Sequence, residues 1–135
     1  PKFNRPWQHV LEPIRGYLIL AKKQFNQPKK YSDAWNFGTK NNSVKSVKEI
    51  IDYMITFWGS GKIRYNKKVK FYEQKNLQLD IKKAKKKLNW YPTYSVKKGV
   101  QITTEWYKNV FKEKKDPYKV TNNQILGYMN ENKWG

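Results

Sequence analysis

Apolar residues recur along this chain at helical spacing in five segments. Steps of three and four residues between apolar positions predict helices over residues 12–25, 46–58, 80–88, 95–111 and 121–129. In the first of these helices the apolar side chains fall on one stripe, the pattern of a helix that packs one face against a core: Val10, Ile14, Leu18, Ala21 and Phe25. In the fourth helix, Val96, Val100, Tyr107 and Val110 are expected to face inward.

Polar residues at the helix ends support these boundaries. Ser46 and Glu49 have the spacing of a capping box, in which a serine side chain and a glutamate side chain satisfy each other's backbone N–H groups. Gly59 follows the second helix and Asn89 follows the third, where a left-handed C-terminal residue is favoured.

The start positions of the three remaining helices are predicted in the same way. Asp80 and Ser95 stand where N-cap residues are preferred, before the third and fourth helices. Thr121 and Gln124 repeat the capping-box spacing and predict the start of the last helix. Residues 27–33 are expected to form a loop.

Strand-forming segments are few. Residues 1–9 are expected to be extended or turn-like, and short strands are predicted over residues 34–38 and 62–65. Strands this short and this widely separated cannot make a complete sheet. The sequence therefore predicts a mostly helical α+β or α/β fragment whose strands complete a sheet that lies upstream. The chain begins at Pro1 instead of a methionine, which also favours a missing upstream part.

The net charge of +19 points towards nucleic acid, and a basic nucleic-acid-binding module is the alternative reading of this sequence. Only three of the 29 basic residues are arginine, namely Arg5, Arg15 and Arg64. Proteins that recognise phosphate or guanine usually employ arginine, whose planar fork matches those acceptors. We therefore interpret the lysines mainly as solvated surface residues.

Residue types that are missing exclude several kinds of site. The chain has no cysteine and one histidine, His9, so that neither a disulfide nor a typical zinc site is expected. The sequence shows no signal peptide and no apolar stretch of the length that a bilayer requires. A cytoplasmic location without membrane contact is expected.

Four short motifs occur in order along the chain. They are Arg-Pro-Trp-Gln-His-Val-Leu-Glu-Pro at residues 5–13, Trp-Asn-Phe-Gly at 35–38, Tyr-Glu-Gln-Lys-Asn-Leu-Gln-Leu-Asp at 72–80, and Leu-Asn-Trp-Tyr-Pro at 88–92. Their order and spacing resemble the C-terminal part of the extended short-chain dehydrogenases/reductases. The first motif is similar to that of the CDP-glucose 4,6-dehydratases in particular. Two positions depart from the dehydratase pattern, which has His-Glu-Ala at residues 72–74 and glycine at residue 89.

The resemblance implies that residues 1–135 are the nucleotide-sugar-binding part of an NAD-dependent lyase. Such an enzyme would remove water from a substrate like CDP-glucose, in the synthesis of deoxysugars. Arg5 would pair with a phosphate or ribose group, and the other implied substrate-binding residues are Trp7, Gln8, His9, Arg64, Tyr72 and Glu73. Taken one by one, these residues also have ordinary structural readings: packing for Trp7, a helix-start hydrogen bond for His9, and an exposed loop for Tyr72 and Glu73.

No catalytic or cofactor-binding residue is predicted in this chain. The family binds NAD at a glycine-rich turn that opens a helix, whereas Gly59-Ser60-Gly61 follows one. Tyr94 and Lys98 match the family's Tyr-x-x-x-Lys spacing, but this composition produces about two such pairs by chance. NAD is therefore expected on an upstream Rossmann domain, in an enzyme that is a homo-oligomer when complete. A related nucleotide-sugar epimerase remains an alternative within the same family.

Overall fold

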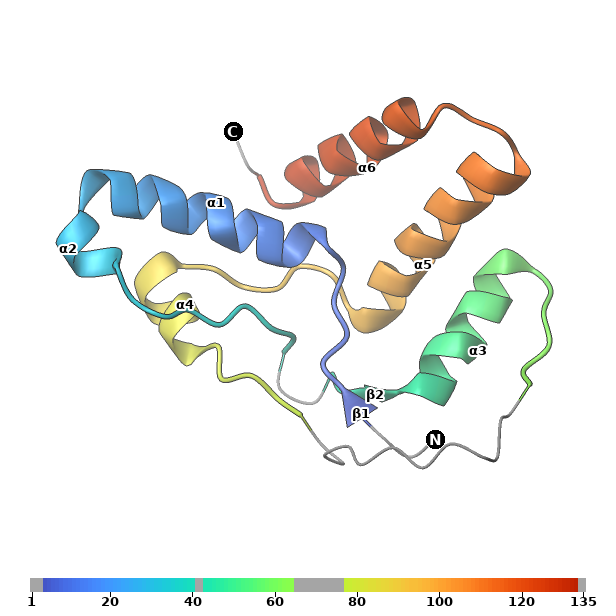
Figure 1. Cartoon of the computed structure of the whole chain (residues 1–135), viewed down its shortest axis with the longest axis horizontal. Coiled ribbons are helices and arrows are strands. Elements are labelled where there is room, and N and C mark those ends of the chain that lie inside the picture. The colour runs from blue at the N-terminus through green and yellow to red at the C-terminus, as the bar shows by residue number, and fades with distance from the viewer. Residues whose placement is uncertain (1–3, 41–42, 65–76, 134–135) are drawn as a thin grey trace.

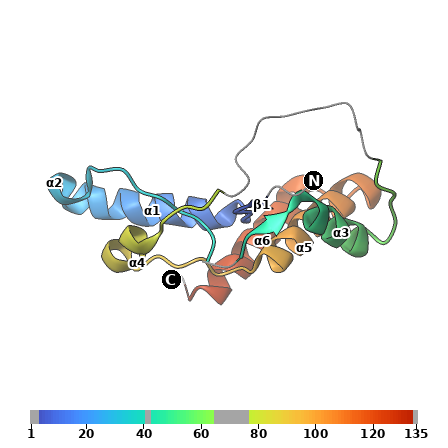
Figure 2. The same cartoon turned by 90° about the horizontal axis from the view of Figure 1, so that it is seen from below.

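The computed structural model describes residues 4–40, 43–64 and 77–133 and is mostly helical (Figure 1). Its elements in chain order are β1 (Asn4–Arg5), α1 (Leu11–Asn26), α2 (Pro28–Tyr31), β2 (Lys45–Ser46), α3 (Val47–Trp58), α4 (Lys82–Leu88), α5 (Val96–Tyr107), the π-helix η1 (Lys108–Lys112) and α6 (Pro117–Glu131). Figures 1 and 2 agree in placing α1, α2 and α4 at one end of the molecule and α3, α5 and α6 at the other.

The hydrophobic core lies between α1, α2 and α4. Its buried residues are Tyr31, Phe37, Ile81, Ala84, Leu88 and Trp90. The rings of Phe37 and Trp90 meet edge to face with centroids 5.0 Å apart, and the Trp90 indole donates to the backbone carbonyl of Glu12 over 3.2 Å. The buried Trp90 therefore ties the Leu-Asn-Trp-Tyr-Pro motif to the start of α1.

The local signals for helix ends are confirmed at three helices. Ser46 and Glu49 form the full capping box at the start of α3, and Gly59 ends that helix in the left-handed conformation. Asn89 ends α4 with φ 53°. Ser95 caps α5 by accepting from the backbone N–H of Lys98.

The two predicted strands are not formed among the described residues. Residues 34–38 and 62–64 carry no strand, and the strand pairing that is present joins β1 to β2, with Asn4 opposite Ser46 and Arg5 opposite Lys45. A strand needs a neighbour to accept its backbone hydrogen bonds. The prediction of strands at 34–38 and 62–64 is therefore wrong for this chain as it stands, and an upstream sheet stays a prediction.

Two further boundary predictions are wrong. The last helix begins at Pro117 with Asp116 as its cap, one turn earlier than Thr121 predicted. Residues 28–31, predicted as loop, form the short helix α2. In the first case the proline at the first helical position and the aspartate before it are the stronger start signal.

The apolar stripe of α1 faces outward. Phe25 is 89% exposed and Leu18 is 51% exposed, whereas Glu12 and Gly16 on the opposite side of the helix are buried. In α5, Tyr107 is likewise half exposed instead of inward. The prediction that the α1 stripe packs on this chain's own core is wrong, because Gly16 provides the flat surface on which Phe37 packs.

No helix in the described ranges is long and apolar enough to cross a membrane. Within the same residues, no three side chains among His, Cys, Asp and Glu gather where they could hold a metal ion.

Candidate functional site

The segment from Arg5 to His9 is held in place by bonds to three other parts of the molecule. Arg5 lies in β1, opposite Lys45 of β2. The Trp7 indole donates to the Lys45 carbonyl over 3.0 Å, and the Gln8 amide donates to the Phe37 carbonyl over 2.9 Å. The first motif is thus attached to the Trp-Asn-Phe-Gly motif and to the start of α3.

His9 is buried between α1 and α5. Its Nδ1 accepts a hydrogen bond from the backbone N–H of Leu11 over 3.3 Å, which is the helix-start hydrogen bond that the sequence suggested. A Cβ atom on Gly99 would lie 3.3 Å from the His9 Cβ atom, so that the absence of a side chain at Gly99 permits this close approach. Burial lowers the pKa of His9, because removal from water disfavours the charged imidazolium.

The positive charge of Lys45, which lies opposite Arg5, is partly balanced by Glu49. Lys45 Nζ lies 2.8 Å from Glu49 Oε1. The pKa of Glu49 falls to about 2, first because of the hydrogen bond from Lys45 and then because of bonds from the backbone and side chain of Ser46. The same hydrogen bond raises the pKa of Lys45. Lys45 is therefore engaged by Glu49 at this point of the β1–β2 pair.

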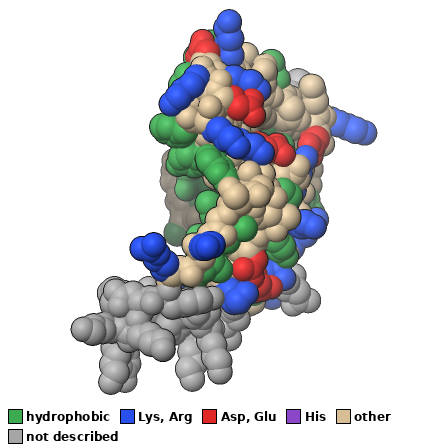
Figure 3. Space-filling model, turned by 90° about the vertical axis from the view of Figure 1, so that its right-hand side faces the viewer, with side chains coloured by type: hydrophobic (Ala, Val, Ile, Leu, Met, Phe, Trp, Pro, Cys, Tyr) green, Lys and Arg blue, Asp and Glu red, His purple; other side chains and the backbone are tan. Residues whose placement is uncertain are grey.

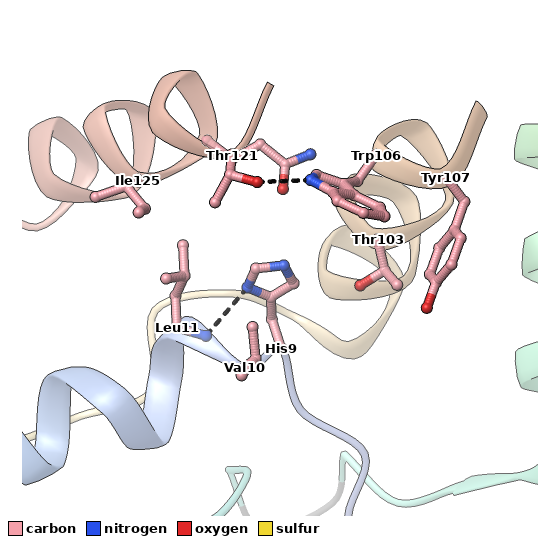
Figure 4. Close-up of a pocket in the computed structure, with 9 residues that line it drawn as sticks. His9, Val10, Leu11, Thr103, Trp106, Tyr107, Thr121 and Ile125 are labelled. Atoms are coloured by element: carbon pink, nitrogen blue, oxygen red, sulfur yellow. Dashed lines mark hydrogen bonds between the residues drawn. The ribbon is translucent and has the colours of Figure 1, made fainter. Parts of the chain in front are cut away.

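Two cavities border this segment, one on each flank of α5. The first has a volume of about 310 Å³, lies between α5 and α6, and is lined by His9, Val10, Leu11, Thr103, Trp106, Tyr107, Thr121, Gln124 and Ile125. In Figure 4 the His9 ring points into this space, facing the side chains of α5 and α6. Trp106 of α5 is partly buried and lines this cavity.

The second cavity has a volume of about 220 Å³ and lies between α3 and α5. It is lined by Trp7, Gln8, Ile50, Met54, Val96, Gly99, Val100, Thr103 and Thr104. The Oε1 atom of Gln8 is buried and accepts no hydrogen bond from the residues that the structure describes. Mostly apolar walls with a few polar groups are typical of small-molecule sites; the first volume is at the lower end of the range for such sites and the second is below it.

Glu12 is the residue near this segment whose role the sequence did not reveal. It is only 1% exposed, and its carboxyl group accepts from the backbone N–H groups of Thr93 and Tyr94 and from the Tyr128 hydroxyl. The sequence signal for its burial was its position between two apolar residues in the first turn of a helix. Glu12 joins α1, the segment before α5, and α6.

The remaining predicted substrate-binding residues do not join this cluster. Arg64 is exposed and belongs to the segment after α3, which runs on the side of α3 away from β1 (Figure 1). Tyr72 and Glu73 lie outside the described residues. The structure therefore brings together Arg5, Trp7, Gln8 and His9 alone among the predicted residues that it describes.

Tyr94 does not have the properties of a catalytic base. Its ring contacts the rings of His9 and Tyr128 edge to face, at centroid distances of 5.7 and 5.0 Å. Burial, followed by the charge of Glu131, raises its pKa to about 12. The rejection of Tyr94 and Lys98 as a catalytic pair stays a prediction.

Basic side chains do not gather into one patch on the face formed by α3, α5 and α6. Figure 3 shows Lys and Arg side chains dispersed there among acidic and hydrophobic ones. A nucleic-acid surface usually presents a continuous basic stripe or patch. This face does not favour the nucleic-acid alternative.

Comparison with known proteins shows which protein the chain resembles. No family model matches the chain. Over 109 residues, which are 80% of this chain, the sequence is 35% identical to the CDP-glucose 4,6-dehydratase of Salmonella typhimurium. The chain is similar to CDP-glucose 4,6-dehydratase. The resemblance predicted from the four motifs is thereby confirmed.

The similarity covers a limited part of that dehydratase. The chain spans 30% of the length of its Salmonella relative, which is consistent with the predicted correspondence to a C-terminal part. The mostly helical fold agrees with the predicted helical fragment.

Proposed function

We propose that this chain is the substrate-binding portion of an NAD-dependent nucleotide-sugar 4,6-dehydratase that acts on CDP-glucose. The observation that carries the proposal is the match of 109 residues to a CDP-glucose 4,6-dehydratase. The longer enzyme of which this chain would be a part is called the parent enzyme below. Its reaction removes water across C5 and C6 of the hexose and leaves a ketone at C4.

Arg5 is proposed to bind a phosphate group of the nucleotide sugar. Its guanidinium can offer two parallel N–H donors to phosphate oxygens, and β1 fixes its backbone opposite Lys45. Trp7, Gln8 and His9 follow directly and border the two cavities. Substrate contacts by Arg64, Tyr72 and Glu73 remain part of the proposal on the strength of the motif resemblance.

The described residues do not fit NAD. Gly59 has φ 95° and ends α3, so the Gly59-Ser60-Gly61 turn does not aim the N–H groups of a helix start at a pyrophosphate. We therefore assign NAD binding to a Rossmann domain elsewhere in the parent enzyme. That domain, and a homo-oligomeric assembly of the complete enzyme, belong to the proposal.

The test is an activity assay of the parent enzyme beside the 135-residue chain. With CDP-glucose, the parent enzyme should form the 4-keto-6-deoxy sugar, detected by mass spectrometry as the loss of one water. The chain alone should form none and should give no saturable heat when titrated with NAD.

Two outcomes would contradict the proposal. Interconversion of C4 epimers without loss of water would identify an epimerase. Preference of the chain for one nucleic-acid sequence by about 1000-fold at physiological salt would identify a specific nucleic-acid reader.

A further inference from the structure

The cavity between α5 and α6 is lined by apolar and uncharged polar side chains. Trp106 and Tyr107 supply aromatic walls from α5, and Ile125 supplies an aliphatic wall from α6. The lining residues that the structure describes include no Lys, Arg, Asp or Glu. Val10 and Tyr107 are exposed, so the cavity opens to solvent at their side chains. The walls therefore suit an uncharged molecule and not a diphosphate, which needs cationic partners.

His9 directs an N–H donor into this cavity. Its Nδ1 atom accepts from the backbone N–H of Leu11, and burial favours the neutral ring by lowering the pKa of His9. A neutral imidazole whose Nδ1 atom accepts a hydrogen bond carries its proton on Nε2. Figure 4 shows Nε2 on the side of the ring away from Leu11, facing the side chains of α5 and α6.

This Nε2–H group is available to a molecule in the cavity, since the described residues offer it no acceptor. Two other polar groups of the lining are already bonded within the protein. The Trp106 indole donates to the Thr121 hydroxyl over 2.8 Å, and the Gln124 amide donates to the Ile102 carbonyl over 2.9 Å. In a cavity with mostly apolar walls, a single donor of this kind fixes the orientation of a bound ligand.

The volume of the cavity, about 310 Å³, sets the size of a suitable ligand. Because an apolar cavity of roughly 150 Å³ accepts one benzene ring, this cavity accepts two fused rings. The rings of Trp106 and Tyr107 are nearly perpendicular, at an interplanar angle of 82°. A flat ligand can meet one of them face to face and the other edge to face, and both contacts are favourable between aromatic rings.

We propose that the cavity between α5 and α6 binds an uncharged aromatic molecule of two fused rings with one acceptor atom, held by the Nε2–H donor of His9. The inference goes beyond the proposed function and does not depend on it. The phosphate contact proposed for Arg5 is no part of this site, because Arg5 is not among the residues that line the cavity.

Quinoline and naphthalene are the probes for this site. Both have two fused rings, but only quinoline has an acceptor, its ring nitrogen, which is uncharged at neutral pH. Binding to the ¹⁵N-labelled 135-residue chain is followed by heteronuclear NMR through the indole N–H signal of Trp106. Trp106→Phe identifies that signal among those of the six tryptophans. The dispersion of the amide signals in the same spectra shows whether each variant is folded.

Quinoline should shift the Trp106 signal saturably, with a Kd of about 1 mM or below. His9→Phe removes the donor and keeps a ring of similar size. Quinoline should then bind about 2- to 10-fold more weakly, while naphthalene binds as before. Met54→Ala is the matched control, because Met54 lines the cavity between α3 and α5 instead, and it should leave the binding of both probes unchanged.

A further variant covers the case in which His9→Phe does not fold. Ile125 lies at an exposed position of the cavity wall, where a larger side chain is tolerated more easily than at the buried His9. Ile125→Phe narrows the cavity and should weaken the binding of both probes about tenfold. Unchanged binding in Ile125→Phe would place the probes elsewhere and overturn the proposal.

Three other outcomes would overturn it as well. The first is the absence of a saturable shift of the Trp106 signal. The second is an equal effect of folded His9→Phe on both probes, because the donor would then make no difference. The third is displacement of quinoline by CDP-glucose, which would make the cavity part of the substrate site. Failure of the CDP-glucose turnover assay bears on the proposed function alone, since quinoline binding is measured on the chain without substrate.

Discussion

The Tyr128 hydroxyl donates a hydrogen bond to Glu12 Oε2 over 3.0 Å, although 116 positions separate the two residues in the chain. The same hydroxyl accepts from Arg15 Nε over 3.3 Å. This contact fastens α6 to the start of α1. Because α6 contributes Thr121, Gln124 and Ile125 to the cavity into which the His9 ring points, the docking of α6 helps to set the shape of that cavity.

Removal of this hydroxyl should destabilise the fold. In Tyr128→Phe, Glu12 loses a buried hydrogen bond and Arg15 a part-buried one, which together should cost about 1–3 kcal/mol of unfolding free energy. Urea denaturation followed by circular dichroism measures the change. The exposed Tyr118 provides a matched control, since Tyr118→Phe should leave the midpoint unaltered, and equal midpoints for both variants would contradict the importance of the Glu12 contact.

Tyr94, which is partly buried, and Tyr128, which is buried, should lower stability at high pH. Burial is the largest cause that raises the pKa of Tyr94 and of Tyr128 to about 12, whereas an unfolded tyrosine has a pKa of about 10. The folded state therefore holds these protons longer than the unfolded state does. Their contribution to stability is fully present below pH 10 and is lost as the pH rises through about 12.

Near-ultraviolet absorbance of tyrosinate measures this titration directly. Ionisation at about pH 12 is expected for Tyr94 and Tyr128, and this late step should disappear in the double variant Tyr94→Phe, Tyr128→Phe. A late step of unchanged size in that variant would assign the raised pKa to other tyrosines.

Two helical glycines should respond in opposite directions to alanine. A Cβ atom on Gly16 would lie 2.4 Å from a Phe37 ring carbon, so Gly16→Ala forces the ring to move and should destabilise the chain by about 1–3 kcal/mol. Gly127 lies within α6, where such a Cβ would have no described atom within 4 Å apart from its chain neighbours and the backbone of its own helix. Gly127→Ala should therefore stabilise by about 0.5–1 kcal/mol through helix propensity. Thermal denaturation of both variants compares them, and a stabilising Gly16→Ala would refute the packing described for α1.

Arg5 should affect substrate affinity in the parent enzyme more than the chemical step. A phosphate far from the reacting carbons is bound similarly in the ground state and the transition state, so its loss appears in KM. Arg5→Ala should raise KM for CDP-glucose about 10- to 150-fold, the equivalent of one charge-assisted hydrogen bond. Arg5→Lys should recover part of this, because an ammonium cannot supply the two-donor fork.

Steady-state kinetics distinguish the alternatives for Arg5. Wild-type kinetics in Arg5→Ala would make it a residue without a role in binding. A fall in kcat at constant KM, in a variant that remains folded, would place Arg5 at the chemistry. Affinity for NAD should stay the same in either variant.

The part of the candidate site that lies within the first motif could be predicted from the sequence. The contacts of that motif with distant parts of the chain could not. The segment Arg5–His9 and the helix-start bond of His9 follow from neighbouring residues in the sequence. Glu12 was visible only as a member of the motif, because its partners Thr93, Tyr94 and Tyr128 come from distant parts of the chain. Nothing in a one-dimensional pattern indicates which carboxyl group such distant donors will meet.

The sequence by itself determined the features whose hydrogen bonds close within a few residues. The Ser46–Glu49 capping box, the left-handed Asn89 and the Ser95 cap each need only their own neighbours. Tertiary structure decided the features that need a distant partner. Thr121 and Gln124 have capping-box spacing, but they lie within α6 and bond across to Trp106 and the Ile102 carbonyl of α5. Among the residues that the structure describes, residues 34–38 have no neighbouring strand. The α1 stripe faces outward because the opposite side of the helix, at Gly16, packs against Phe37.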